Sequence, residues 1–169
     1  MGYVLLGLRM SWIYYVCAIL IVILIKWKHN TKTGILFGYM FLVFASTVLR
    51  RGATNVANID LKPLRYFTIT ANTLRVDNLQ QFAANTIMFV PVGMLMTAVM
   101  QKWSVVFCCL FSVFIETSQF ILHRGFCETD DVISNTIGAI IGVGFYYIAI
   151  GFKQRFLSFY LDYQKEKHS

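Results

Sequence analysis

Five long apolar stretches constrain this chain more than any other feature of its sequence. They cover residues 3–25, 34–49, 82–100, 103–122 and 132–152. A helix of about 20 apolar residues is long enough to cross the hydrocarbon layer of a membrane. The second stretch is short for this, and would need a thinner bilayer or arginines that reach the interface. The pattern predicts an all-α, polytopic membrane helical bundle with about five transmembrane helices.

Composition agrees with this class and argues against the others. The chain is 57% hydrophobic and only 14% charged, whereas a soluble domain is roughly 45–50% apolar and about 25% charged. A 169-residue soluble enzyme could not hide so much apolar surface, and disorder is excluded by the same excess. The formal charge of +7 is interpreted as a topology signal. No basic stripe with stacking aromatic residues is present, so we expect no nucleic-acid partner, and we expect no cofactor.

The segments between and beyond the apolar stretches carry further expectations. The first stretch could be a signal peptide, but it is long, lacks a small-residue cleavage site and ends in lysines, so we predict a retained helix. Pro91 should kink or break the third helix. The connection over residues 52–81 is too long for a tight hairpin and too polar to span, which predicts an interfacial or partly re-entrant loop. Residues 153–169 are expected to form a basic interfacial tail of a single domain, 1–169.

The basic residues predict an orientation in the membrane. With five spans, one side collects eight lysines and arginines and the other collects seven. The short loop after the first helix and the C-terminal tail favour the first group as cytoplasmic. We therefore expect a multi-pass protein of the bacterial cytoplasmic (inner) membrane, with its N-terminus outside and its C-terminus in the cytoplasm.

Polar side chains within the last three stretches are candidates for function, because such groups are costly inside a bilayer. The fourth stretch carries Glu116, Gln119 and His123 at spacings that place them on one helix face. At the start of the fifth, Asp131 and Asn135 lie four residues apart. We expect these five side chains, together with Asn85 near the start of the third helix, to gather near the outer interface, with Glu116 about a turn deeper.

Structural explanations compete with functional ones at several of these positions. Gly138 and Gly142 continue the stripe of Asp131 and most simply predict close helix packing. Asn85 and Asn135 could hydrogen-bond across helices, and one acidic residue near the start of the fifth helix could be a cap. Glu116 is harder to explain, because a carboxylate among apolar residues must be protonated, paired or exposed to water. Arg124 could pair with the acidic loop 128–131 or bind an anionic ligand.

Three sequence blocks resemble the VanZ-like family. They are Asn85-Thr-Ile-Met-Phe-Val-Pro91-Val-Gly93, then Ile115-Glu116-Thr-Ser-Gln119, then Arg124-Gly-Phe-Cys-Glu128-Thr-Asp130-Asp131-Val-Ile-Ser-Asn135-Thr-Ile-Gly138-Ala-Ile-Ile-Gly142. A weaker loop motif precedes them, so the resemblance covers residues 58–142. Glu128 departs from the family, which more often has aspartate there. The family is named for a bacterial membrane protein linked to low-level resistance to the glycopeptide antibiotic teicoplanin, but it implies no biochemical mechanism.

One functional hypothesis is a polar pocket that binds an amphiphile in the outer leaflet. Candidates are membrane lipids, a lipid-linked cell-envelope precursor or a lipoglycopeptide. Phenylalanines of the fourth helix would flank its chain (Phe107, Phe111, Phe114 and Phe120). Basic residues could bind a phosphate, and the ligand-binding candidates are Arg50, Arg51, Lys62, Arg65, Asn85, Gln119, Arg124, Glu128, Asp130 and Asn135.

Other hypotheses remain open. In an intramembrane enzyme, Glu116 would act as general base with His123 or Asp131 as partner. No metal site is predicted, although a divalent cation at Glu128, Asp130 and Asp131 is a weak alternative. The polar residues could instead serve only helix assembly or organise a protein partner. Ion transport is a weaker alternative, because the sequence has one deeply placed acid and no inverted repeat.

Overall fold

The structure is a computed structural model that describes residues 16–22, 31–52, 59–64 and 77–168. Nearly all of these residues are helical, which confirms the predicted all-α class. Residues 16–22 are helical, and the remaining helices are α2 (Thr31–Phe44), the π-helical turn η1 (Ala45–Leu49), α4 (Asp77–Met100), the 3-10 turn η2 (Gln101–Trp103), α5 (Ser104–Ile121) and α6 (Thr129–His168). The described residues also include two paired strands of two residues each, β1 (Ile59–Asp60) and β2 (Cys127–Glu128).

Three helical stretches are long and apolar enough to cross a membrane, by length and composition, within the described ranges. They are Thr31–Leu49, Asn78–Ile121 and Thr129–Lys167. The second contains both α4 and α5, which are separated by η2 and pack against each other. Because most of the first predicted span lies outside the described residues, the count of about five spans stays a prediction. The three long apolar helical stretches fit a membrane protein.

The boundaries of the helices follow the apolar stretches closely. α2 and η1 together cover the second stretch, and α5 ends within a residue of the expected end of the fourth. α4 begins at Asp77, inside the predicted loop 52–81, and continues through Pro91 without a break. Of the two outcomes expected at Pro91, a break is not found, and a kink stays a prediction. Proline removes one backbone hydrogen bond, and helices packed in a membrane bundle tolerate that loss. Of the loop itself, residues 53–58 and 65–76 lie outside the described part.

Close packing between α4 and α6 forms the centre of the bundle. The two helices run in the same direction, because Thr86 lies at Gly138 and Val90 lies at Gly142. A Cβ atom added at either glycine would collide with the backbone carbonyl of its partner. Gly93 of α4 is equally tight against the backbone of Ala139. The predicted packing role of Gly138 and Gly142 is thus confirmed, since only glycine lets these backbones approach so closely.

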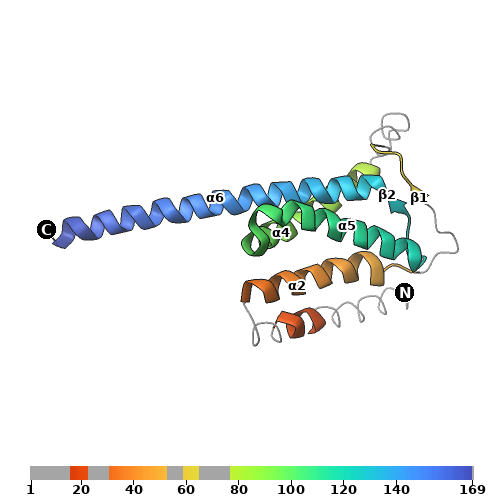
Figure 1. Cartoon of the computed structure of the whole chain (residues 1–169), viewed down its shortest axis with the longest axis horizontal. Helices are drawn as coiled ribbons and strands as arrows, with labels where there is room; N and C mark the ends of the chain where they lie inside the picture. Colours follow the sequence, from red (N-terminus) through yellow and green to blue (C-terminus); the bar gives the residue numbers. More distant parts are fainter. Residues whose placement is uncertain (1–15, 23–30, 53–58, 65–76, 169) are drawn as a thin grey trace.

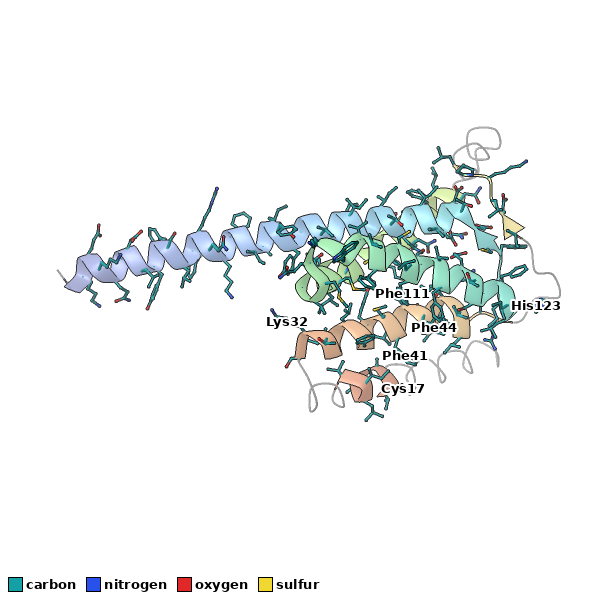
Figure 2. All side chains as sticks on the ribbon, in the orientation of Figure 1. Cys17, Lys32, Phe41, Phe44, Phe111 and His123 are labelled. Atoms are coloured by element: carbon teal, nitrogen blue, oxygen red, sulfur yellow. The ribbon has the colours of Figure 1, made fainter. Side chains whose placement is uncertain are left out.

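An apolar core joins α2 and α5 to this pair of helices. Phe89 and Val92 of α4 are fully buried, and the core extends to Leu36 and Val43 on α2 and to Ile115 on α5. Aromatic rings connect the layers, as Figure 2 shows for the labelled Phe44 and Phe111. The rings of Phe44 and Phe114 stack with centroids 5.5 Å apart, and Phe111 lies 5.9 Å from Phe89.

α6 is much longer than the helices it packs against. Its 40 residues span about 60 Å at roughly 1.5 Å per residue, twice the thickness of a membrane hydrocarbon layer of about 30 Å. Figure 1 shows its C-terminal half projecting away from the bundle, with the other helices alongside its N-terminal half. The predicted tail over residues 153–169 is thus a continuation of α6 as far as His168. Its location at a membrane interface stays a prediction.

Candidate functional site

Buried polar side chains gather at one end of the bundle, which we call the polar end. Here α4 and α6 begin, α5 and η1 end, and β1 lies beside β2 (Figure 1). The two loops meet because Ile59 and Asp60 pair in parallel with Cys127 and Glu128. The buried or half-buried polar residues at this end are Gln81, Asn85, Ser112, Glu116, Gln119, Asp130, Asp131, Ser134 and Asn135.

Asp131 connects the start of α6 to the start of α4. Its side chain is only 3% exposed. Asn85 Nδ2 donates to Asp131 Oδ1 at 2.8 Å, and Gln81 Nε2 approaches the two carboxylate oxygens at 3.3 and 3.4 Å. A buried carboxylate needs such donors, because its desolvation is costly. The structure therefore brings Asn85 and Asp131 together, as the sequence predicted.

Glu116 lies on α5 and is 2% exposed. Its Oε2 accepts a hydrogen bond of 3.1 Å from the backbone N–H of Glu128, which the pairing of β2 with β1 holds in place. Among the described residues, the charged side chains near the Glu116 carboxyl group include Asp131, Arg51 and Glu128. Glu116 and Asp131 are thus two almost fully buried carboxyl groups that come from different helices.

Two buried amide side chains each have one oxygen without a donor. Gln119, 1% exposed, donates from Nε2 to the backbone carbonyl of Thr47 at 3.2 Å. Asn135, 3% exposed, donates from Nδ2 to Ser112 Oγ at 2.8 Å. Gln119 Oε1 and Asn135 Oδ1 are fully buried and accept no hydrogen bond. Such unsatisfied acceptors are rare in folded proteins, and a bound molecule with a hydrogen-bond donor would satisfy them.

The π-helical turn η1 explains why side chains reach its carbonyl groups. The N–H of Arg50 bonds to the carbonyl of Ala45, five residues back, at 2.9 Å. At the end of this turn, Leu49 and Arg51 present carbonyl groups to Arg124, whose Nη1 donates to them at 2.6 and 3.1 Å. Arg124 therefore caps η1. Arg124 therefore hydrogen-bonds to these two carbonyl groups and not to the acidic loop 128–131, as one expectation had it. The alternative, that Arg124 binds an anionic ligand, stays a prediction.

The side chains of Arg51 and Gln119 both lie next to Gly125. A Cβ atom added at Gly125 would lie 2.8 Å from Arg51 Nη1 and 3.4 Å from Gln119 Oε1. The absence of a side chain at Gly125 thus leaves room for both groups. Arg50 and Lys62 are exposed, and Arg65 lies outside the described residues.

The acidic loop before α6 is tied to the β1 segment. Asp130 is buried and accepts a short hydrogen bond from the backbone N–H of Leu64, while Thr129 Oγ1 donates to the carbonyl of Asp60 at 3.4 Å. Among the described residues, no group of three or more histidine, cysteine or acidic side chains is arranged to hold a metal ion. The weak alternative of a cation at Glu128, Asp130 and Asp131 therefore gains no support.

His123 does not share the face of Glu116 and Gln119. α5 ends at Ile121, and His123 follows with a positive φ of 51°. Its side chain is exposed, and Figure 2 shows it at the outer edge of the polar end. Helical spacing could not place it, because the helix stops two residues earlier. The expectation that His123 continues the helix face of Glu116 and Gln119 is therefore wrong, and its role as a partner of Glu116 stays a prediction.

Cys127 of β2 lies close to the same acidic side chains. Burial raises the pKa of its thiol, and the carboxyl groups of Glu116, Asp131 and Glu128 raise this pKa further. A negative charge on sulfur is disfavoured close to carboxylates. The pKa of Cys127, which lies outside the candidate spans, therefore depends on the negative charge at the polar end.

Sequence reasoning missed four parts of this site. The π-helical turn and the hydrogen bond from Gln119 to Thr47 left no recognisable signal. Ser112 could have been found, because it lies one turn before Glu116 on the same face of α5. The pairing of β1 with β2 had only the weak loop motif around Asp60 as a signal.

Comparison with known proteins gives one match. The model of the VanZ/LLP1 family matches residues 12–150, which is most of the chain. No curated protein and no solved structure matches the chain.

Proposed function

This chain belongs to the VanZ/LLP1 family, and we propose that its polar end binds the head group of an amphiphile in the membrane. The candidate ligands are membrane lipids, a lipid-linked cell-envelope precursor or a lipoglycopeptide. By the orientation that the basic residues predict, this site lies in the outer leaflet of the bacterial inner membrane, with the N-terminus outside and the C-terminus in the cytoplasm. A role in teicoplanin resistance would be a consequence of such binding.

The observation that carries this proposal is the pair of buried acceptors, Gln119 Oε1 and Asn135 Oδ1. Neighbouring polar groups such as Asp131 are satisfied by donors from other helices. A cluster that served helix assembly alone would be expected to satisfy these two oxygens as well, since each unpaired buried acceptor costs about 1–3 kcal/mol. A head group that brings hydrogen-bond donors removes this cost.

The apolar surroundings suit the chain of an amphiphile. Phe107 and Phe114 are exposed on α5, and exposed apolar side chains on a membrane helix face lipid. Phe111 instead packs against Phe89, inside the bundle. An acyl or prenyl chain could therefore run along α5 past Phe107 and Phe114, with its head group at Gln119.

Lipid retention tests the proposal directly. The purified full-length chain is examined by native mass spectrometry in a mild detergent, with Glu116→Gln and Asp131→Asn as site variants. Thr117→Val is the matched control, because Thr117 is exposed on the same helix and bonds only to its own backbone. We expect wild type and control to retain an amphiphile and both site variants to lose most of it. Retention by all four, or by none, would overturn the proposal.

A second candidate function is acid–base chemistry on a lipid-linked substrate, favoured by the two buried carboxyl groups of Glu116 and Asp131 at the polar end. Paired carboxyl groups can divide the roles of proton donor and acceptor. Glu116→Gln should then abolish turnover of the bound lipid while leaving its retention intact. Loss of retention without any product in the wild type favours binding instead.

A further inference from the structure

We propose that the C-terminal half of α6 pairs, in parallel, with the same segment of a second copy of this chain. The contact surface is an aromatic seam, which we define as Phe152, Phe156, Phe159 and Tyr163. The inference does not depend on ligand binding at the polar end. It is drawn from the spacing of the seam, from its exposure and from the charged side chains that border it.

The spacing of the seam is that of a coiled coil. Its four residues follow one another at intervals of four, three and four, so they occupy positions a and d of a heptad repeat. The same repeat passes backward through Phe145 to Gly142 and Gly138, which pack closely against the backbone of α4. α6 thus presents one continuous packing side, but α4 ends at Met100 and covers only the first part of it.

The seam has no packing partner within the described part of the chain. Phe152, Phe156 and Phe159 are each about 70% exposed, and Tyr163 is 56% exposed. At roughly 1.5 Å per residue α6 is about twice as long as the hydrocarbon layer is thick, so that layer cannot cover both halves of a helix that continues in one direction. Figure 1 shows α6 continuing in this way. Exposed apolar surface of this kind marks an interaction site.

The side chains that border the seam suit a parallel second copy. In a parallel pair, a residue at position g lies next to position e of the other helix, five residues further along. Asp162 occupies g and Lys167 occupies e, so a symmetric pair forms this ion pair twice. Within one helix, residues five apart point in directions that differ by about 140°, so the two side chains do not face each other there. Arg155 at g meets Tyr160 at e in the same way, as a cation over an aromatic ring.

Membrane insertion favours the parallel arrangement. Two copies inserted in the same orientation are related by a twofold axis along the membrane normal, which makes their α6 helices parallel. The alternative cover for the seam is a membrane surface. α6 would then have to turn away from the direction of its N-terminal half, whereas it is a single helix from Thr129 to His168 and contains no proline.

Disulfide cross-linking of the full-length chain in liposomes tests the pairing. The four native cysteines are replaced by serine. Tyr163→Cys then places a thiol at position a of the seam, and the matched control Gln164→Cys places one at position b, on the outer side. We expect mild oxidation to link most copies that carry Tyr163→Cys and few that carry Gln164→Cys. Equal linking of the two variants, or linking of neither, would overturn the proposal.

Energy transfer between copies labelled at Gln164→Cys measures how strongly they associate. Phe156→Ser should weaken association at least about tenfold, because it removes a large apolar side chain from each half of the seam. Leu157→Ser is the matched control, since Leu157 is also exposed but lies at position b. It should change association by less than about twofold. Association that both substitutions leave intact would show that the seam is not the contact.

A charge exchange tests the parallel register. Asp162→Lys should weaken association about fivefold, because it replaces two exposed ion pairs of the dimer by repulsion. Adding Lys167→Asp to the same chain restores opposite charges between the copies and should recover most of the loss. A double variant no better than the single one would contradict the pairing of g with e.

The depth of the seam decides between a second copy and a membrane surface. A chain that stays monomeric, and whose fluorophore at Tyr163→Cys is quenched by brominated lipids, overturns the proposal in favour of the membrane surface. Figure 1 shows the other helices alongside the N-terminal half of α6 only. The pairing should therefore leave the free energy of unfolding of a single bundle in dilute detergent unchanged.

Discussion

The two halves of α6 reverse the usual relation between polarity and burial. In the N-terminal half, Asp131 and Asn135 are almost fully buried. In the C-terminal half, Phe152, Phe156 and Phe159 are each about 70% exposed. The polar residues lie inside and the aromatic residues lie outside, within one continuous helix.

Periodicity does not cause this difference. Residues seven positions apart lie on nearly the same side of a helix, offset by about 20° per seven residues. Phe145, Phe152 and Phe159 therefore continue the side on which Gly138 packs against α4. What changes is the neighbour, because α4 ends at Met100 while α6 continues to His168. The comparison teaches that burial in this chain is decided by which helix lies alongside, and that apolar character alone does not predict it.

The largest expected effect comes from placing a methyl group between α6 and α4. Gly142→Ala puts a Cβ against the backbone carbonyl of Val90, which cannot move aside as a side chain could. We expect the free energy of unfolding to fall by about 3 kcal/mol, at the upper end of overpacking effects. Thermal or denaturant unfolding in detergent, followed by circular dichroism, measures this change.

The matched control is two residues away. A Cβ atom added at Gly144 would have nothing within 4 Å of it. Gly144→Ala should leave stability unchanged or raise it by up to about 1 kcal/mol, the difference in helix propensity. Equal losses for both variants would contradict the close packing of α4 and α6.

A smaller effect is expected from removing a charge in each half of α6. Asp131→Ala leaves the amide donors of Asn85 and Gln81 without their carboxylate, and should cost about 1–3 kcal/mol. Asp162→Ala removes an exposed carboxylate from the C-terminal half and should change stability by less than about 0.5 kcal/mol. The same unfolding assay compares them. Similar values for the two would mean that Asp131 is not held as the structure describes.

Much of the fold could be predicted from the sequence, because helix length and apolar run length are local properties. The boundaries of α5 and the packing of Gly138 and Gly142 followed from periodicity and residue size. The meeting of Asn85 with Asp131 followed from the order of the helices and the direction in which each crosses the bundle.

The remaining parts depend on how distant segments meet. Helical spacing placed His123 beside Gln119, but it could not show that α5 ends at Ile121. The charge of Arg124 suggested an anionic partner, whereas its position next to η1 gives it backbone carbonyls. A π-helical turn and a two-residue strand pair are too short to leave a periodic signal. These features build much of the candidate site, so the site was less predictable than the fold.

Thiol reactivity should differ by a modest factor between β2, just before α6, and the C-terminal half of α6. Two proteins with a single cysteine are compared, one that keeps only Cys127 and one that carries only a thiol introduced by Ser158→Cys, with all other cysteines replaced by serine. Cys127 should react with iodoacetamide more slowly at pH 8 than the introduced thiol. The raised pKa of Cys127 lowers its thiolate fraction at this pH. The rates should converge as the pH rises above the pKa values of both thiols.

The pH profile separates this cause from simple shielding. Shielding slows the reaction equally at every pH, whereas a raised pKa shifts the midpoint of the profile upward. Asp131→Asn should move the midpoint of Cys127 back toward that of an ordinary thiol, because it removes one of the negative charges that raise it. An unchanged midpoint in this variant would contradict the acidic surroundings assigned to β2.

The smallest effect is expected from removing the end of the helix. A chain that stops after Phe152 loses the lysines of the C-terminal half and its exposed aromatic residues beyond Phe152. The side-chain hydrogen bond described in this segment, from Ser158 Oγ to the carbonyl of Arg155, lies within the helix itself. The bundle should therefore keep its free energy of unfolding to within about 0.5 kcal/mol, as expected for changes far from packed groups. A loss above about 1 kcal/mol in the same assay would mean that the aromatic residues are covered in the folded protein, and the contrast between the two halves of α6 would then disappear.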